Sequence, residues 1–117
     1  MAIEFTPGHF TGRDDAIAEI AANGLFLAEA ELGPEQLTGA AHVHPYDVEI
    51  YVLDGCFDLE EPDTGCKYRL DAGSRTVVPA DTLHAESCAG RFHALFGVSE
   101  DPAPMMAARA AELARSS

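Results

Sequence analysis

Three histidines and two acids are spaced so that they could bind a metal ion together. His42 and His44 lie two residues apart, acids follow at Asp47 and Glu49, and a third histidine lies downstream at His84. Side chains of a β-strand alternate between its two faces, so His42 and His44 can point to the same side. Two imidazoles on one face of a strand supply two thirds of a facial metal site, and His84 could supply the third ligand.

The other two histidines have simpler interpretations. His9 lies in an N-terminal arm or edge segment and is interpreted as a surface residue. His93 lies on the face of the last strand opposite its apolar residues, so a structural or surface role is expected there. Tyr46, Tyr51 and Glu86 remain as candidates for an acid, a base or a hydrogen-bond donor, with core packing favoured for Tyr51.

Short strands separated by turn residues must position these side chains. Period-two alternation, β-branched residues and breaks at Gly or Pro predict the strands. Early acids and an Asn-Gly stop predict a helix over 13–23, and an Ala-rich composition predicts another over 105–115. The predicted strands cover 25–32, 37–44, 48–53, 56–59, 66–70, 75–78, 83–87 and 91–98. Their number and spacing indicate an all-β sandwich or barrel.

The composition is that of an ordinary globular protein with an acidic surface. The 117 residues fit one domain, 1–117, and 47% of them are hydrophobic. A net charge of -13 argues against nucleic acid and against anionic membrane surfaces as partners. We find no signal peptide and no apolar run of about 20 residues, so a cytoplasmic protein is expected.

The cysteines give no metal-binding or redox motif. Cys56, Cys66 and Cys88 are odd in number and lack Cys-x-x-Cys spacing, so they are interpreted as free thiols in a reducing compartment. A Cys56–Cys66 bridge across a hairpin is the alternative.

The two stretches that carry the histidines resemble the two sequence motifs of the cupin superfamily. Residues 39–55 resemble the first motif, which holds a His-x-His pair, an acid and a closing glycine. Residues 73–88 resemble the second motif, which holds a proline followed by a histidine, here His84. The resemblance covers about residues 25–98 and is to the small single-domain cupins. It implies a double-stranded β-helix, the jelly roll, with short N- and C-terminal helices and one metal ion inside the barrel.

The resemblance also implies a ligand set, in which the acid is the open position. The implied ligands are His42, His44, Glu49 and His84. Counting from His44 places the acid at Glu49, whereas counting back from Gly55 places it at Val48. If the apolar residues of this strand face the barrel interior, Glu49 points away from the metal unless a bulge re-aims it. Asp47, Glu86 or no carboxylate at all are the alternatives.

The resemblance further implies a metal-dependent function on a small molecule. Imidazole and carboxylate ligands suit a divalent transition metal such as Fe, Mn, Ni, Cu, Co or Zn. Such a site keeps coordination positions open, at which a substrate, alone or with dioxygen, could bind. We expect a metal-dependent enzyme with dioxygenase-like chemistry or with isomerase or lyase chemistry. The alternative is a non-catalytic module that binds or senses a small molecule. A homodimer is expected, because small cupins commonly pair and a short barrel leaves sheet edges to be covered.

Overall fold

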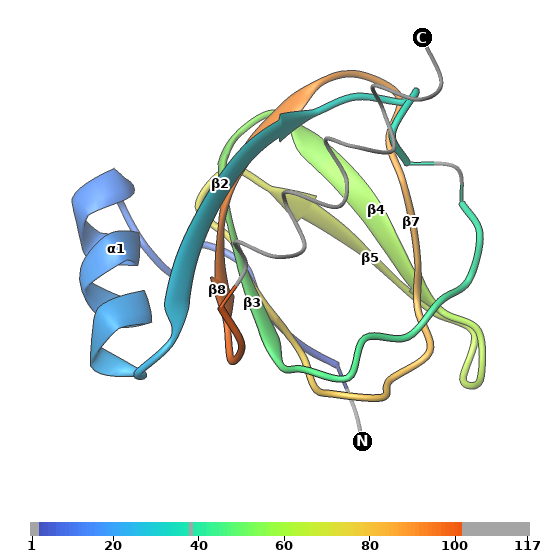
Figure 1. Cartoon of the computed structure of the whole chain (residues 1–117). Coiled ribbons are helices and arrows are strands. Elements are labelled where there is room, and N and C mark those ends of the chain that lie inside the picture. Colours follow the sequence, from blue (N-terminus) through green and yellow to red (C-terminus); the bar gives the residue numbers. More distant parts are fainter. Residues whose placement is uncertain (1–2, 38, 102–117) are drawn as a thin grey trace, which may run out of the picture.

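Two antiparallel sheets face each other and form the β-barrel that the sequence predicts (Figure 1). The computed structural model describes residues 3–37 and 39–101. The larger sheet has the strand order β1-β6-β3-β8-β2, and the smaller sheet has the order β5-β4-β7. The elements in chain order are β1 (Glu4–Thr6), α1 (Arg13–Ala22), β2 (Phe26–Leu32), β3 (Val48–Asp54), β4 (Cys56–Glu61), β5 (Cys66–Asp71), β6 (Arg75–Val78), β7 (Ala85–Ser87) and β8 (Phe92–Val98).

Apolar side chains of both sheets fill the space between them. On β3, Val48, Ile50 and Val52 point into this core, whereas Glu49 and Tyr51 point to the outer face of the larger sheet. The buried core residues are Ile3, Ile50, Val52, Phe57, Leu59, Leu70, Val78, Phe92 and Ala94. Full burial of a side chain of the size of Leu or Phe contributes about 1.5–3 kcal/mol. This core therefore fixes which face of each strand points inward.

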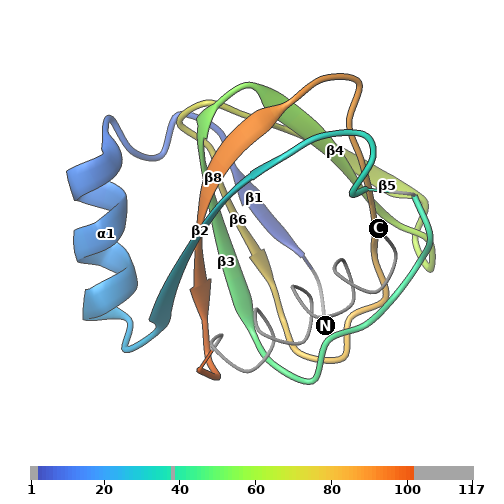
Figure 2. The same cartoon turned by 45° about the horizontal axis from the view of Figure 1, so that its top comes forward.

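Helix α1 covers the outer face of the larger sheet (Figure 2). Asp14 and Asp15 lie in its first turn, where the helix dipole favours acids, and Asn23 caps its C-terminal end. The helix and the sheet share a second core cluster, made of Ala16, Ile20, Tyr51 and Leu95. The predicted helix over 13–23 is thus confirmed to within one residue.

The segment 39–44 extends the smaller sheet beyond β7, but it forms only an isolated bridge there. His42 and His84 exchange backbone hydrogen bonds of 2.8 and 3.0 Å. The carbonyl of His44 accepts a 2.7 Å bond from the N–H of Asp81, one residue away from the register that the His42–His84 pair sets. The predicted strand over 37–44 is therefore wrong in its extent, because this shift in register ends the ladder after one pair.

The connection from β3 into β4 and β5 is a tight turn followed by the predicted hairpin. Gly55 has a φ of +76°, and a Cβ there would lie 2.6 Å from the carbonyl oxygen of Arg91, so no other residue fits. Cys56 begins β4 and Cys66 begins β5, so antiparallel pairing puts these two free thiols at opposite ends of the hairpin. The alternative Cys56–Cys66 bridge is excluded by this distance.

The N-terminal end of the described chain tests one further expectation. The N-terminal stretch, expected to be an arm or edge segment, contributes β1, which pairs with β6 at one edge of the larger sheet. The helix predicted over 105–115 lies outside the described residues. Among the residues that the structure describes, no helix is long and apolar enough to cross a membrane.

Candidate metal centre

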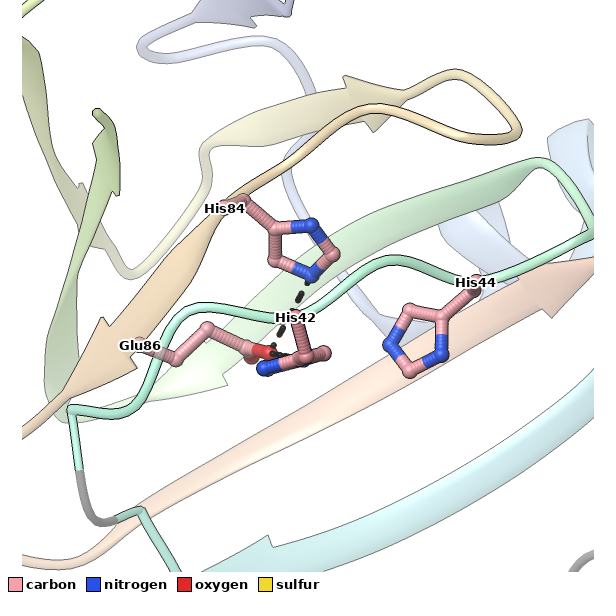
Figure 3. A group of neighbouring side chains, drawn as sticks. All are labelled: His42, His44, His84 and Glu86. Carbon is pink, nitrogen blue, oxygen red and sulfur yellow. Dashed lines mark ion pairs between the residues drawn. The ribbon is translucent and has the colours of Figure 1, made fainter. Parts of the chain in front are cut away.

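Antiparallel pairing brings three histidines and one glutamate to a single face of the smaller sheet. His42 lies directly opposite His84, and each of the two strands carries one further residue of the group at a spacing of two. Residues two apart on a strand share a face, and diagonal cross-strand neighbours are within reach of each other. His42, His44, His84 and Glu86 therefore point to the same side of the pair (Figure 3).

The four side chains converge closely. Each offers one ligand atom, and these atoms all lie within 4.8 Å of one another. The ring centroids are 4.4 Å apart for His42 and His84, 4.8 Å for His42 and His44, and 5.2 Å for His44 and His84. His84 is only 3% exposed, whereas 40% of the His42 side chain is exposed. The cluster thus has one buried wall and one side open to solvent.

Each imidazole of the cluster has an oxygen partner on its Nδ1 atom. His42 Nδ1 lies 3.0 Å from the carbonyl oxygen of Ala40, and His84 Nδ1 lies 2.9 Å from that of Thr82. A carbonyl only accepts, so both rings donate from a protonated Nδ1, and Nε2 is the atom that is left to face the cluster. His44 Nδ1 lies 3.1 Å from the hydroxyl of Tyr46. A bonded Nδ1 and an Nε2 that faces the site are the arrangement of metal-ligating histidines.

Glu86 lies between the Nε2 atoms of His42 and His84 (Figure 3). Its Oε1 is 3.2 Å from His42 Nε2 and 3.5 Å from His84 Nε2. Burial alone raises the pKa of Glu86, but the hydrogen bonds from His42 and His84 and their charges reverse this and lower it to about 2. The carboxylate is therefore ionised, and the Nε2 protons that it accepts are the ones a metal ion would replace. Among the described residues, no Lys or Arg pairs with it.

The surroundings shift the pKa values of the two more exposed imidazoles, His42 and His44, in opposite directions. The hydrogen bond to Glu86 raises the pKa of His42, against the effect of burial. Burial lowers the pKa of His44, and the neighbouring His42 and His84 lower it further. A positive charge on all three rings at once is thus disfavoured, and one divalent ion could replace the protons that the cluster would otherwise need.

Glu49, the acid that the motif count favoured, lies on the outer face of the larger sheet, away from the histidine cluster. It is 8% exposed, and its carboxylate accepts hydrogen bonds from Arg75 at 2.9 Å, Tyr51 at 2.7 Å and Asn23 at 3.1 Å. The structure brings Glu49 to helix α1 and not to the histidines. Alternation along β3 is the reason, because Val48 and Ile50 occupy the inner face and no bulge intervenes before Val52.

Asp47, the second acid that was considered, connects two loops. Its carboxylate accepts a 2.8 Å bond from the N–H of Ala80, and its backbone N–H and C=O both bond to Ser99. The loop after His44 and the loop before His84 are joined in this way. Asp47 thus holds the two ligand-bearing segments in register from outside the cluster.

The remaining sequence candidates lie apart from the centre. His93 pairs with Glu29 at 2.5 Å on the outer surface, and His9 pairs with Glu19 at 2.9 Å beside α1. Tyr51 is fully buried against α1. Only Tyr46 touches the cluster, through His44. Glu86 was an open alternative in the sequence, and its signal is the spacing of two from His84 on one strand.

The donor set fits a divalent transition ion. Three neutral imidazoles and one carboxylate suit such a metal, and bonds of about 2.1 Å would place trans ligand atoms about 4.2 Å apart. The observed upper limit of 4.8 Å is near that span, so a small inward movement closes the set. The exposed side at His42 leaves room for a further ligand from solvent.

Comparisons with known proteins agree with the fold. The sequence matches no protein-family model and no curated protein. The fold is similar to acireductone dioxygenase from Bacillus anthracis with a cadmium ion in its active centre, at a TM-score of 0.63 and 19% identity, covering 74% of this chain and 59% of that one. It is also similar to a DUF861 family protein from Thermotoga maritima, at a TM-score of 0.54 and 13% identity, covering 81% and 97% of the two chains.

A third similar structure is a putative ethanolamine utilization protein from Salmonella typhimurium, at a TM-score of 0.50 and 14% identity, covering 85% of this chain and 70% of that one. The first two of these neighbours are cupin-type structures, so the chain has the cupin jelly-roll fold, as the two motifs predicted. Identities this low carry the fold and not the activity.

Proposed function

We propose that this chain is a metal-dependent cupin that holds one divalent transition ion with His42, His44, His84 and Glu86 and acts on a small molecule. The observation that carries the proposal is the Glu86 carboxylate, which lies 3.2 and 3.5 Å from the Nε2 atoms of His42 and His84, two imidazoles whose Nδ1 atoms already donate to backbone carbonyls. A buried carboxylate needs a cation, and neutral imidazoles do not supply one. A bound metal ion satisfies all four groups at once.

Within this site the residues have different tasks. A bound metal would polarise a coordinated substrate, or bring substrate and dioxygen together, at its open positions. His84 and Glu86, the more buried members of the cluster, would hold the ion from β7 and the residue before it. His42, the more exposed ligand, borders the side where a substrate could approach. The core between the sheets is filled by apolar side chains, so a substrate would bind on the exposed side of the cluster, next to His42.

We favour an enzyme with dioxygenase-like chemistry over an isomerase or a lyase. The similar structure with the highest TM-score of those named above is called a dioxygenase and holds a metal ion in its active centre. This chain spans 59% of that protein's length, so the proposed activity is a hypothesis about the reaction class and not about the substrate.

A non-catalytic binding or sensing module is the second candidate. The observation in its favour is the core between the sheets, which apolar side chains of both sheets fill. Both candidates share the same metal ligands. Dioxygen consumption by the metal-loaded protein would favour the enzyme, whereas ligand-dependent stabilisation without turnover would favour the module.

The homodimer expected from the sequence remains a proposal. In the described part of the chain, the edge strands of the larger sheet are β1, which is three residues long, and the longer β2. Phe26 and Leu27, at the start of β2, are 48% and 43% exposed. We place the contact between two copies along this edge, because an edge strand with exposed apolar residues favours association.

Metal content tests the proposed site directly. Elemental analysis of protein purified without added metal should find about one divalent transition ion per chain. His84→Ala should lose most of it and keep the fold, because His84 bonds through its side chain only to the cluster and to Thr82. The matched control is His93→Ala, which should keep its metal. A full complement of metal in His84→Ala would refute the site.

A further inference from the structure

The three imidazoles of the metal centre differ in what fixes their orientation. His42 and His84 are each bonded at Nδ1 to a backbone carbonyl, two residues away in the same strand segment. His44 is bonded at Nδ1 to a side chain, the hydroxyl of Tyr46, at 3.1 Å. His44 also makes no ion pair with Glu86, unlike the other two rings (Figure 3).

This difference has a chemical consequence for the tautomer of His44. A carbonyl can only accept, so it forces the proton onto Nδ1 and leaves Nε2 as a metal ligand. A phenol hydroxyl can accept or donate. As an acceptor it selects the ligating tautomer of His44, and as a donor it would bind the Nδ1 lone pair and leave a proton on Nε2. The direction of the hydrogen bond between Tyr46 and Nδ1 therefore decides whether His44 can bind a metal through Nε2.

Tyr46 is well placed to control that ring. Its own ring stacks on His44, with centroids 5.0 Å apart and an angle of 21° between the planes. The neighbouring Asp47 bonds to Ala80 and Ser99 and holds the loop that carries Tyr46. Ring stacking and the loop contacts of Asp47 together hold the phenol beside His44.

We propose that Tyr46 is the positioning residue of His44, holding its Nε2 atom toward the metal by accepting a hydrogen bond from Nδ1. The inference rests on the proposed metal site and assigns within it the one ligand whose orientation depends on a side chain. His44 is accordingly the ligand most easily released, and Tyr46 sets how firmly it is held. Tyr46 itself does not contact the metal.

Replacing the hydroxyl alone separates its effect from that of the ring. Tyr46→Phe keeps the stacked ring and removes the hydrogen bond. We expect its affinity for Co²⁺, measured by competition with a chromophoric chelator, to fall about tenfold, the low end of the effect of such outer partners. The visible spectrum of bound Co²⁺ should change as well, because the imidazole is less well oriented. The control Tyr68→Phe, on β5, should match the wild type.

A double-mutant cycle tests whether Tyr46 acts through His44. In a His44→Ala background, Tyr46→Phe should cause no further loss of Co²⁺ affinity. An equal loss in both backgrounds, or an unchanged affinity and spectrum in Tyr46→Phe alone, would overturn the inference. Failure of the wild type to bind Co²⁺ would instead overturn the metal site itself. Thermal unfolding of the metal-free variants identifies any loss of affinity that comes from misfolding.

Discussion

Glu49 and Glu86 are two largely buried carboxylates on opposite sides of the same barrel, and their partners differ in charge. Glu49 is bonded to the guanidinium of Arg75, to the hydroxyl of Tyr51 and to the amide of Asn23. Glu86 is bonded to two imidazoles, which are neutral when they act as metal ligands. The outer carboxylate has a permanent cation in the protein, and the inner one does not.

The comparison separates an acid whose charge is compensated within the chain from an acid that we propose as a metal ligand. The outer group consists of Glu49, Arg75, Tyr51, Asn23 and Glu19, and within it the charge of Glu49 is balanced by Arg75. It also connects α1 to the sheet, since Arg75 pairs with Glu19 of the helix at 3.0 Å. The inner group, made of Glu86 and the three histidines, has no Lys or Arg among the described residues to balance the carboxylate. On the side of His42 it is open to solvent. Burial alone does not mark a functional acid, but burial together with an incomplete set of partners does.

Removing the cation of the outer group should have the largest effect on stability. Arg75→Met leaves the carboxylates of Glu49 and Glu19 without their guanidinium. We expect a loss of about 3 kcal/mol, the low end for a broken buried pair, because 20% of the Arg75 side chain is exposed. Urea unfolding measures the loss, and the metal content should not change.

Arg69→Met is the matched control for this prediction. Arg69 pairs with Asp58 at 3.0 Å, but 70% of its side chain is exposed. Exposed pairs contribute under about 1 kcal/mol. Equal losses in the two variants would show that the outer group is not the internally compensated site that the comparison assumes.

Removing the charge of each glutamate in turn should distinguish the proposed metal ligand from the acid that stabilises the fold. Glu86→Gln removes the only carboxylate of the cluster, so metal affinity should fall at least tenfold, or about 1.4 kcal/mol. Glu49→Gln should leave metal affinity unchanged and reduce stability, because Arg75 loses its partner. Isothermal titration with Zn²⁺ and unfolding of the metal-free proteins give both quantities. The reverse result would make Glu49 the ligand, as the motif count suggested.

The sequence predicted the fold and three of the clustered residues because both depend on local patterns. Alternation and turn residues placed the strands, and the spacing of His42 and His44 placed them on one face. Alternation along β3 also indicated that Glu49 points outward, in conflict with the motif count, and the structure follows the alternation. Where the two signals disagreed, the one based on packing of the core was correct.

The partners of the two carboxylates could not be predicted, because they depend on long-range register. Glu86 reaches His42 only because His84 lies directly opposite His42, a pairing between segments 42 residues apart. Arg75 reaches Glu49 because β6 lies beside β3 in the larger sheet. No local pattern encodes which strands become neighbours, so a sequence with one motif count offers several acids and no means of choosing among them.

The smallest effect concerns Glu19, at the exposed end of the outer group, and it should depend on pH. Burial raises the pKa of Glu19, but hydrogen bonds from His9 and Tyr51, with the charges of His9 and Arg75, lower it overall below its ordinary value of 4.5. A carboxyl group with a lowered pKa stabilises the folded state above about pH 4.5, and this contribution is lost as the pH falls through its folded value. Glu19→Gln should therefore be less stable than the wild type at pH 7, by under about 1 kcal/mol, because a third of the side chain is exposed.

The difference between wild type and Glu19→Gln should shrink as the pH falls from 6 to 3, as urea unfolding at a series of pH values would show. Glu60→Gln changes the net charge equally and lies outside the outer group, so it controls for the general effect of charge. A difference that stays constant down to pH 3 would mean that the carboxylate of Glu19 does not stabilise the helix through His9, Tyr51 and Arg75. Only the ion pair of Glu49 and Arg75 would then stabilise the outer group. The comparison of the two sites would be between that one pair and the carboxylate of Glu86, which has no Lys or Arg partner among the described residues.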